Sequence, residues 1–221
     1  MKRLLLFLGI LMMSVTVQAG PVKLLVLGDS LSVGHNLATR DSFWAQLGAA
    51  LKKKGENVQV LNYSKSGETT AGGLKKVGAA MTRHPDGVLV QLGSNDAFQK
   101  VPVKETTKNL TAIVEKFQQA GVPVFLIGMI APMDMPQEYR DAFEKMYVEV
   151  ATEHDTLLYP FFMAGLWKED GGHVSEDCFL SDGIHPSAKG VQIMVQNITP
   201  AILQFLQEDV LPRKIEKEKT K

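Results

Sequence analysis

The chain has 221 residues, and its 24 lysines and arginines balance 24 aspartates and glutamates, so its formal net charge is zero. This balance gives no electrostatic basis for binding nucleic acid, so we expect a small-molecule partner and no nucleic acid. The length suits one domain with a substantial core, and the single cysteine, Cys178, excludes an internal disulfide.

The first nineteen residues have the pattern of a secretory signal peptide. Lys2 and Arg3 precede an apolar run over Leu4–Val17, and the small residue Ala19 follows. The run is shorter than the roughly 20 residues that a membrane-spanning helix needs. We therefore expect residues 1–19 to be cleaved after Ala19, and the mature protein to be exported to the periplasm or secreted, with no stable membrane insertion.

Beyond the signal peptide, short apolar runs alternate with amphipathic stretches, which predicts an α/β fold. The expected strands are Val22–Leu27, Val58–Leu61, Val88–Leu92, Val124–Ile127 and Thr156–Leu158. The expected helices are Phe43–Lys54, Gly72–Arg83, Val103–Ala120, Gln137–Glu153 and Ser187–Leu206.

Strands alternating with helices imply parallel pairing through right-handed crossovers. We expect a three-layer α/β/α sandwich with a five-stranded parallel sheet in the flavodoxin-like order 2-1-3-4-5. Most of the strand runs are rich in Val, Ile and Leu, which is typical of strands buried on both faces. Residues 20–209 should form this single domain, and residues 210–221, which are charged and lack apolar periodicity, a flexible tail.

Four short motifs occur in order along the chain: Gly28-Asp29-Ser30-Leu31, an isolated Gly67, Gly93-Ser94-Asn95-Asp96 and Asp182-Gly183-Ile184-His185. The first three follow the first three strands, and the carboxyl ends of parallel strands meet at one edge of a sheet. That edge, near the point where strand order reverses, is where open α/β sheets bind ligands. Together the motifs supply a hydroxyl nucleophile, oxyanion donors and an acid–base pair, which acyl transfer by a serine esterase requires.

The candidate nucleophile Ser30 needs a histidine base, because an alcohol is unreactive at neutral pH. His185 has an aspartate, Asp182, three residues earlier in a turn made rigid by Pro186, so the carboxylate can hold one ring nitrogen and direct the other at Ser30. The remaining histidines suit the role less well. His35 has no acidic neighbour close in the sequence, and His84 comes at the start of a strand, at the opposite edge of the sheet. His154 lies at the end of a helix, and His173 lies in a surface loop beside glycines.

Two other residues near these motifs are candidates for chemistry, but we assign them none. Asp29 should point away from the substrate and bind the backbone of the turn that presents Ser30. Cys178 has the acidic neighbours Glu176 and Asp177, which raise rather than lower the pKa of a thiol, so we interpret it as a bystander.

On these motifs the chain resembles the SGNH hydrolases, also called the GDSL esterase/lipase family. The bacterial branch that contains thioesterase I, lysophospholipase L1 and arylesterase is the most similar. The segments 66–74 (SGETTAGGL) and 159–162 (YPFF) also resemble that branch, so the resemblance covers nearly all of the mature chain.

The resemblance implies a serine hydrolase whose triad is Ser30, Asp182 and His185, acting through an acyl-enzyme. The N–H groups of Ser30 and Gly67 and the side-chain amide of Asn95 would form the oxyanion hole. No metal or organic cofactor is required, so we expect none. The chain departs from the branch at Ser94, where a second glycine is common.

The substrate is less closely defined by the sequence than the chemistry. We expect Met129, Ile130 and Met133, in the apolar loop after the fourth strand, to line a groove for a short or medium acyl chain or an aryl ester. Phe161 and Phe162, after the fifth strand, suit core packing at least as well. The small-molecule partner is thus an acyl ester or thioester; we expect a monomer, although the sequence does not determine the oligomeric state.

The alternative function is a non-catalytic flavodoxin-like module that binds a phosphorylated ligand near Gly28–Gly34. That loop lacks the Gly-Lys-Ser/Thr sequence of a phosphate-binding P-loop. An α/β-hydrolase is disfavoured as well, because the chain contains no Gly-x-Ser-x-Gly.

Overall fold

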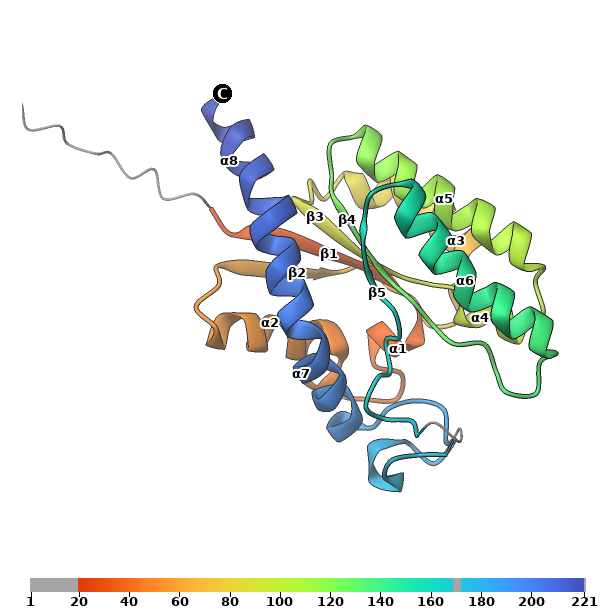
Figure 1. Ribbon diagram of the computed structural model, residues 1–221. Coiled ribbons are helices and arrows are strands. Elements are labelled where there is room, and N and C mark those ends of the chain that lie inside the picture. Colours follow the sequence, from red (N-terminus) through yellow and green to blue (C-terminus); the bar gives the residue numbers. More distant parts are fainter. Residues whose placement is uncertain (1–19, 169–171, 221) are drawn as a thin grey trace, which may run out of the picture.

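The computed structural model describes residues 20–168 and 172–220, so the expected signal peptide lies outside the described residues. A parallel sheet in the order β2-β1-β3-β4-β5 forms the middle layer (Figure 1). Its strands are β1 (Val22–Gly28), β2 (Val58–Asn62), β3 (Gly87–Gln91), β4 (Val124–Ile127) and β5 (Leu157–Tyr159). The predicted fold class and strand order are confirmed.

Helices cover both faces of this sheet, as predicted (Figure 1). One layer contains α2 (Phe43–Lys53) and α7 (Ala188–Phe205), which pack together. The opposite layer contains α3 (Thr70–Met81), α5 (Val103–Gln119) and α6 (Gln137–Glu153). Among the described residues, no helix combines the length and the apolar character needed to cross a membrane.

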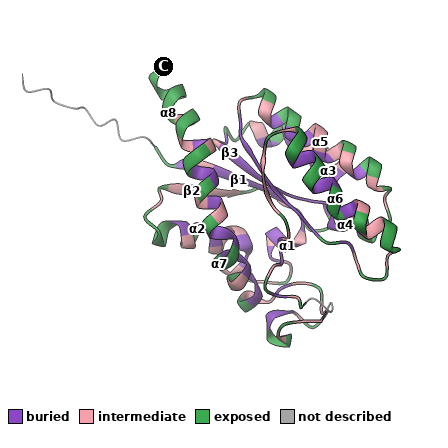
Figure 2. Ribbon diagram, viewed as in Figure 1, coloured by how far each residue is buried: buried purple, intermediate pink, exposed green. Residues whose placement is uncertain are grey.

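The core lies along the central strands, which are buried except at Lys23 of β1 (Figure 2). β2 and β5 are only partly buried, because each lies at an edge of the sheet and has a neighbouring strand on one side only. The expectation of burial on both faces was therefore wrong for β2. Its apolar side chains pack against α2 but remain partly accessible.

Short helices occupy several connections, and their length is too small for an apolar repeat to reveal them in the sequence. At the carboxyl edge of the sheet, α1 (Ser30–Val33) follows β1 and α4 (Ser94–Phe98) follows β3. Two 3-10 turns are present at η1 (Thr39–Asp41) and η2 (Glu176–Cys178). Each of α1 and α4 begins with residues of a predicted catalytic motif.

The segment expected to be a flexible tail is helical in the structure. A π-helical turn, η3 (Leu206–Val210), continues α7 into α8 (Leu211–Lys219). The charged side chains of α8 hold it against the amino edge of the sheet: Lys214 Nζ lies 3.0 Å from Asp86 Oδ2, and Lys217 Nζ donates to the Gly121 carbonyl at 3.0 Å. Apolar periodicity did not reveal this helix because polar contacts anchor it.

Lys214→Ala should lower the free energy of unfolding by about 1–2 kcal/mol, between the values typical of exposed and of buried ion pairs. The Lys214 and Asp86 side chains are only 13% and 18% exposed, so removing Lys214 leaves a largely buried carboxylate without its cation. Urea unfolding measures the change. Lys145→Ala, which breaks the exposed pair with Glu149, is the control and should have a smaller effect. Equal effects would contradict the bracing role of Lys214.

Candidate active site

Ser30, His185 and Asp182 form a continuous chain of hydrogen bonds. The Nε2 atom of His185 lies 2.9 Å from Ser30 Oγ, and its Nδ1 atom lies 2.8 Å from Asp182 Oδ2. Both distances are those of well-formed hydrogen bonds. This is the arrangement in which a carboxylate orients an imidazole that can accept the proton of a serine hydroxyl.

The loop that carries Asp182 and His185 is closed by the aspartate itself. Asp182 Oδ1 accepts from the backbone N–H groups of Ile184 and His185, both at 2.9 Å. Desolvation by burial raises the pKa of Asp182, but these N–H groups and the His185 ring together outweigh it and lower the pKa to about 2. The Asp182 carboxylate is therefore ionised at every pH at which a neutral imidazole can act as a base.

The turn that presents Ser30 is held by its neighbour Asp29, which is fully buried. Asp29 Oδ1 accepts from the Leu31 N–H at 2.9 Å and so caps α1, which confirms the expectation that Asp29 serves the backbone of the turn. Burial raises the pKa of Asp29 to about 6, although the bond from Leu31 opposes the shift. Ser30 therefore starts a helix whose entry is fixed by a buried cap.

Gln91 also holds this turn, and the sequence interpretation missed it. Its Oε1 atom accepts from the Asp29 N–H at 3.3 Å and from Ser32 Oγ at 2.8 Å. Gln91 is the last residue of β3, and a buried amide at the carboxyl end of an apolar strand is the signal that could have identified it. It links β3 to the residues on both sides of Ser30.

The candidate oxyanion donors lie on the two neighbouring strand-to-helix connections. Gly67 has a φ of 76°, in the left-handed region that favours glycine, and its N–H has no acceptor within the described chain. Asn95 Nδ2 donates to the Glu68 carbonyl at 2.9 Å and lies 3.5 Å from Asp29 Oδ2. The side chain of Asn95 thus joins the Gly67 loop to the turn that carries Ser30.

The conformation of Gly93 and Ser94 explains why the departure at Ser94 is tolerated. Gly93 has a φ of 123°, and a side chain there would collide with the hydroxyl of Tyr147, which donates to the Leu92 carbonyl at 2.8 Å. Ser94 is already the first residue of α4, so its side chain requires no special backbone. Glycine is needed at the first of these two positions only.

Two histidines outside the triad contact the site, which the sequence did not predict. The His35 ring lies against the His185 ring, with 4.5 Å between the centroids. His173 Nε2 lies 3.0 Å from the carbonyl oxygen of Gly183, inside the Asp182–His185 loop. By contrast, His84 lies before β3 at the opposite edge, as expected.

The expected substrate residues do not share one environment. Ile130 and Met133 are exposed in the loop after β4, but Met129 is buried in the core. The reason is that Gly128 continues the pairing with the next segment: its N–H donates to the Tyr159 carbonyl at 2.8 Å. Met129 therefore still lies within the packed layer, and its expected place on the surface of a groove was wrong. Phe162 is buried, which agrees with core packing.

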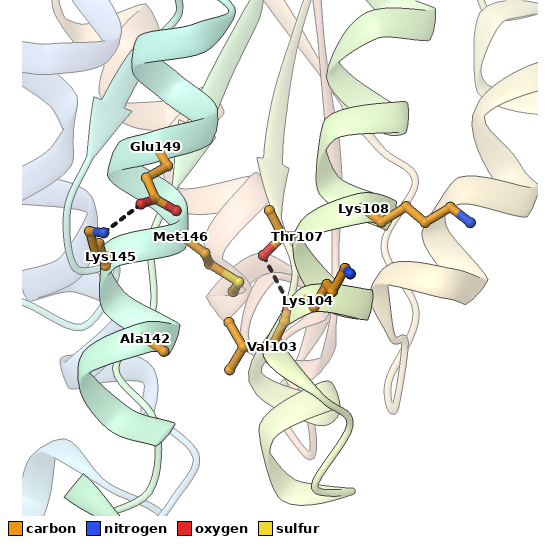
Figure 3. A pocket seen from close by; sticks show the side chains of 8 residues that line it. All are labelled: Val103, Lys104, Thr107, Lys108, Ala142, Lys145, Met146 and Glu149. Carbon is orange, nitrogen blue, oxygen red and sulfur yellow. Dashed lines mark hydrogen bonds and ion pairs between the residues drawn. The ribbon is translucent and has the colours of Figure 1, made fainter. Parts of the chain in front are cut away.

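A separate hollow of about 520 Å³ lies between α5 and α6 (Figure 3). Its lining includes Val103 and Met146, together with the exposed ion pair between Lys145 and Glu149. No residue of the four motifs lines it, so we do not assign the chemistry to this hollow. Within residues 20–168 and 172–220, no three His, Cys, Asp or Glu side chains are grouped so that they could hold a metal ion.

Comparison with known proteins identifies the family of the chain. Residues 26–193 match the model of the GDSL-like lipase/acylhydrolase family. The chain belongs to this family. The matched segment includes the four motifs, so the chain is a serine hydrolase of the GDSL/SGNH type.

Similar proteins align over most of their length. Esterase TesA from Pseudomonas aeruginosa is 32% identical over 207 residues, which cover 93% of this chain and all of that protein. The arylesterase of Vibrio mimicus is 32% identical over 185 residues, covering 83% of this chain and 90% of the relative. The psychrotrophic esterase EstA from Pseudoalteromonas sp., in a crystal structure inhibited by monoethylphosphonate, is 27% identical in sequence. The structural match covers 84% of this chain and 99% of the EstA chain, with a TM-score of 0.77.

The lowered pKa of Asp182 predicts how the stability of the protein varies in acid. Its folded-state pKa of about 2 lies below the ordinary value of 3.8. Ionised Asp182 therefore stabilises the fold above about pH 4, and this contribution is lost as the pH falls through about 2. The excess stability of the wild type over Asp182→Asn should be constant above pH 4 and should shrink towards pH 2.

Urea unfolding at a series of pH values measures this difference. Asp134→Asn is the control, because Asp134 is an exposed carboxylate in the loop before α6. A difference between the wild type and Asp182→Asn that does not change between pH 4 and pH 2 would contradict the stabilising role of the ionised carboxylate.

Proposed function

We propose that the protein hydrolyses carboxylic esters or thioesters through an acyl-enzyme formed on Ser30. The observation that carries the proposal is the hydrogen-bonded series from Ser30 through His185 to Asp182. Relatives described as an esterase and an arylesterase are consistent with this reaction.

In the proposed reaction, His185 Nε2 removes the proton from Ser30 Oγ as that oxygen attacks the acyl carbonyl carbon. Asp182 holds Nδ1–H and stabilises the imidazolium that forms. His185 then gives the proton to the leaving alcohol or thiol. A water molecule, deprotonated by the same ring, attacks the acyl-enzyme and releases the carboxylic acid and free Ser30.

The negative oxygen that develops on the acyl carbonyl needs hydrogen-bond donors that are already in place. The Ser30 N–H is the first amide of α1 and has no acceptor within its helix, and the Gly67 N–H is also unpaired among the described residues. Asn95 can use the second hydrogen of its amide by exchanging the long 3.5 Å contact with Asp29 Oδ2 for the substrate oxygen, since the first hydrogen is directed at the Glu68 carbonyl. We assign these three groups to the oxyanion hole.

For the substrate, we propose an acyl or aryl group that lies against the exposed Ile130 and Met133. Flexible apolar side chains in a loop beside the carboxyl edge suit such a group, with Met129 beneath them in the core. Export by a signal peptide at residues 1–19 remains part of the proposal. The alternative of a non-catalytic ligand-binding module has no support from the comparisons.

Hydrolysis of a chromogenic ester and a chromogenic thioester by the wild type and by Ser30→Ala tests this function. Ser30→Ala should retain less than about a thousandth of the wild-type kcat, because a triad without its nucleophile cannot form the acyl-enzyme. A phosphonate ester should phosphonylate Ser30 with loss of its alcohol, so that the peptide that contains Ser30 gains the mass of the phosphonyl group.

Cys178→Ala is the control for this experiment and should remain active. The Cys178 thiol is buried, and this burial raises its pKa. The neighbouring Asp177 carboxylate raises the pKa as well, so a thiolate nucleophile is disfavoured. Full activity in Ser30→Ala, or loss of activity in Cys178→Ala with the fold intact, would overturn the assignment of Ser30.

Asn95→Ala should lower kcat by about 10²–10³-fold and change KM little, because its bond to the acyl oxygen strengthens only in the transition state. Steady-state kinetics on the same ester give both constants. Asn109→Ala is a matched control, because Asn109 donates to Thr70 on α3 and lies outside the proposed site. An unchanged kcat for Asn95→Ala would remove Asn95 from the oxyanion hole.

A further inference from the structure

Asp182 and His185 lie on a long connection between β5 and α7, in which regular structure is limited to a 3-10 turn among the described residues. A reactive alignment must therefore be maintained by contacts within the connection. The backbone supplies some of these: the Leu180 N–H donates to the His185 carbonyl, and the Gly183 N–H donates to the Leu180 carbonyl. The carbonyl of Gly183, in the same loop, faces the ring of His173.

His173 meets the catalytic loop directly. Its Nε2 atom lies 3.0 Å from the Gly183 carbonyl oxygen, and a Cβ added to Gly183 would lie 3.6 Å from His173 Cε1. A carbonyl oxygen can only accept, so this hydrogen bond requires the proton on Nε2. In the neutral ring, the Nε2–H tautomer makes the bond, and the doubly protonated ring makes it as well.

The His173 ring is itself held in place. It stacks on Phe179, with centroids 3.7 Å apart and planes at 16°, and Trp167 meets both rings edge-on. The side chain of His173 is only 15% exposed. A ring fixed by packing gives its N–H a defined direction, which a mobile surface side chain would not.

The second ring nitrogen of His173 makes a weaker contact, at the surface. His173 Nδ1 lies 3.2 Å from Glu176 Oε2, but the Glu176 side chain is 88% exposed, so this pair contributes little. Among the described residues, Glu176 is the charged group that contacts the ring. The bond from Nε2 to Gly183 needs no proton on Nδ1, because the neutral Nε2–H tautomer donates it and the doubly protonated ring donates it as well.

We propose that His173 is a positioning residue that anchors the catalytic loop by donating a hydrogen bond to the Gly183 carbonyl. Gly183 directly follows Asp182, and the next two backbone N–H groups close on the Asp182 carboxylate. The Gly183 carbonyl belongs to the peptide that joins Gly183 to Ile184, and the N–H of that peptide donates to Asp182. Fixing this carbonyl therefore fixes the turn that delivers His185 to Ser30. The inference rests on the proposed function for its kinetic consequences.

The test compares His173→Leu, which keeps an apolar contact with Phe179 but has no donor, with His173→Gln, whose amide N–H has a similar reach. His173→Leu should lower kcat by roughly tenfold or more, since a misplacement of about 1 Å can cost about 10²-fold, and KM should stay within about twofold. His173→Gln should recover most of the loss.

The control is His84→Asn, which removes an exposed imidazole near the opposite edge of the sheet. Asn tolerates the φ of 50° at that position, so the backbone is not strained. Its kcat should equal that of the wild type. Wild-type kcat in folded His173→Leu, or an equal loss in His173→Gln and His173→Leu, would overturn the anchoring role.

Two further measurements test the anchoring role even if a variant does not fold or no substrate is found. The first measures the nitrogen chemical shifts of the His173 ring in the wild type, which needs no folded His173→Leu. The proton must reside on Nε2 when the ring is neutral, and a proton on Nδ1 alone would overturn the proposal. The rate at which a phosphonate ester labels Ser30 should fall in His173→Leu. A wild type that labels but hydrolyses no ester would refute the proposed function and leave this readout intact.

Discussion

The hydrogen bond between Ser30 and His185 is the constraint on which the site depends, because it joins residues 155 positions apart. Neither side chain can act alone: the hydroxyl needs the base, and the base needs Asp182 to orient it. The sheet fixes one partner, since Ser30 lies two residues after β1, whose apolar side chains are buried. The other partner is brought to it by the connection before α7.

The two halves of the site are built in different ways. Ser30, Gly67 and Asn95 lie on short connections that follow adjacent strands, and their positions are set by buried contacts such as those of Asp29 and Gln91. The acid and the base lie in an irregular segment held by its own carboxylate and backbone bonds and, in our proposal, by His173. Desolvation in the first half raises the pKa of Asp29, whereas backbone donors in the second lower that of Asp182.

The features that could be predicted from the sequence are those that local pattern determines. Runs of Val, Leu and Ile predict the strands, and an apolar stripe that includes Leu110, Val114 and Phe117 predicts α5. Once the sheet is parallel, the position of a motif after a strand is enough to bring Ser30 and Asn95 to one edge.

Other features depend on tertiary contacts that no local pattern contains. Gln91 resembles an ordinary strand terminus until its amide is seen to hold the turn at Ser30. The helix α8 has no buried apolar residue and is retained by Lys214, so apolar periodicity could not reveal it. His173 resembles a loop histidine that follows two glycines, and only the folded connection brings its ring to Gly183.

The separation of nucleophile and base between sheet and connection has a consequence for how such an enzyme can be altered. The segment between β5 and α7 carries acid and base together and enters and leaves the fold at two fixed points, the end of β5 and the Ser187 cap of α7. The segment is therefore a unit that can be exchanged between related enzymes. Exchange with the corresponding segment of a relative would replace half of the catalytic machinery while every strand kept its register.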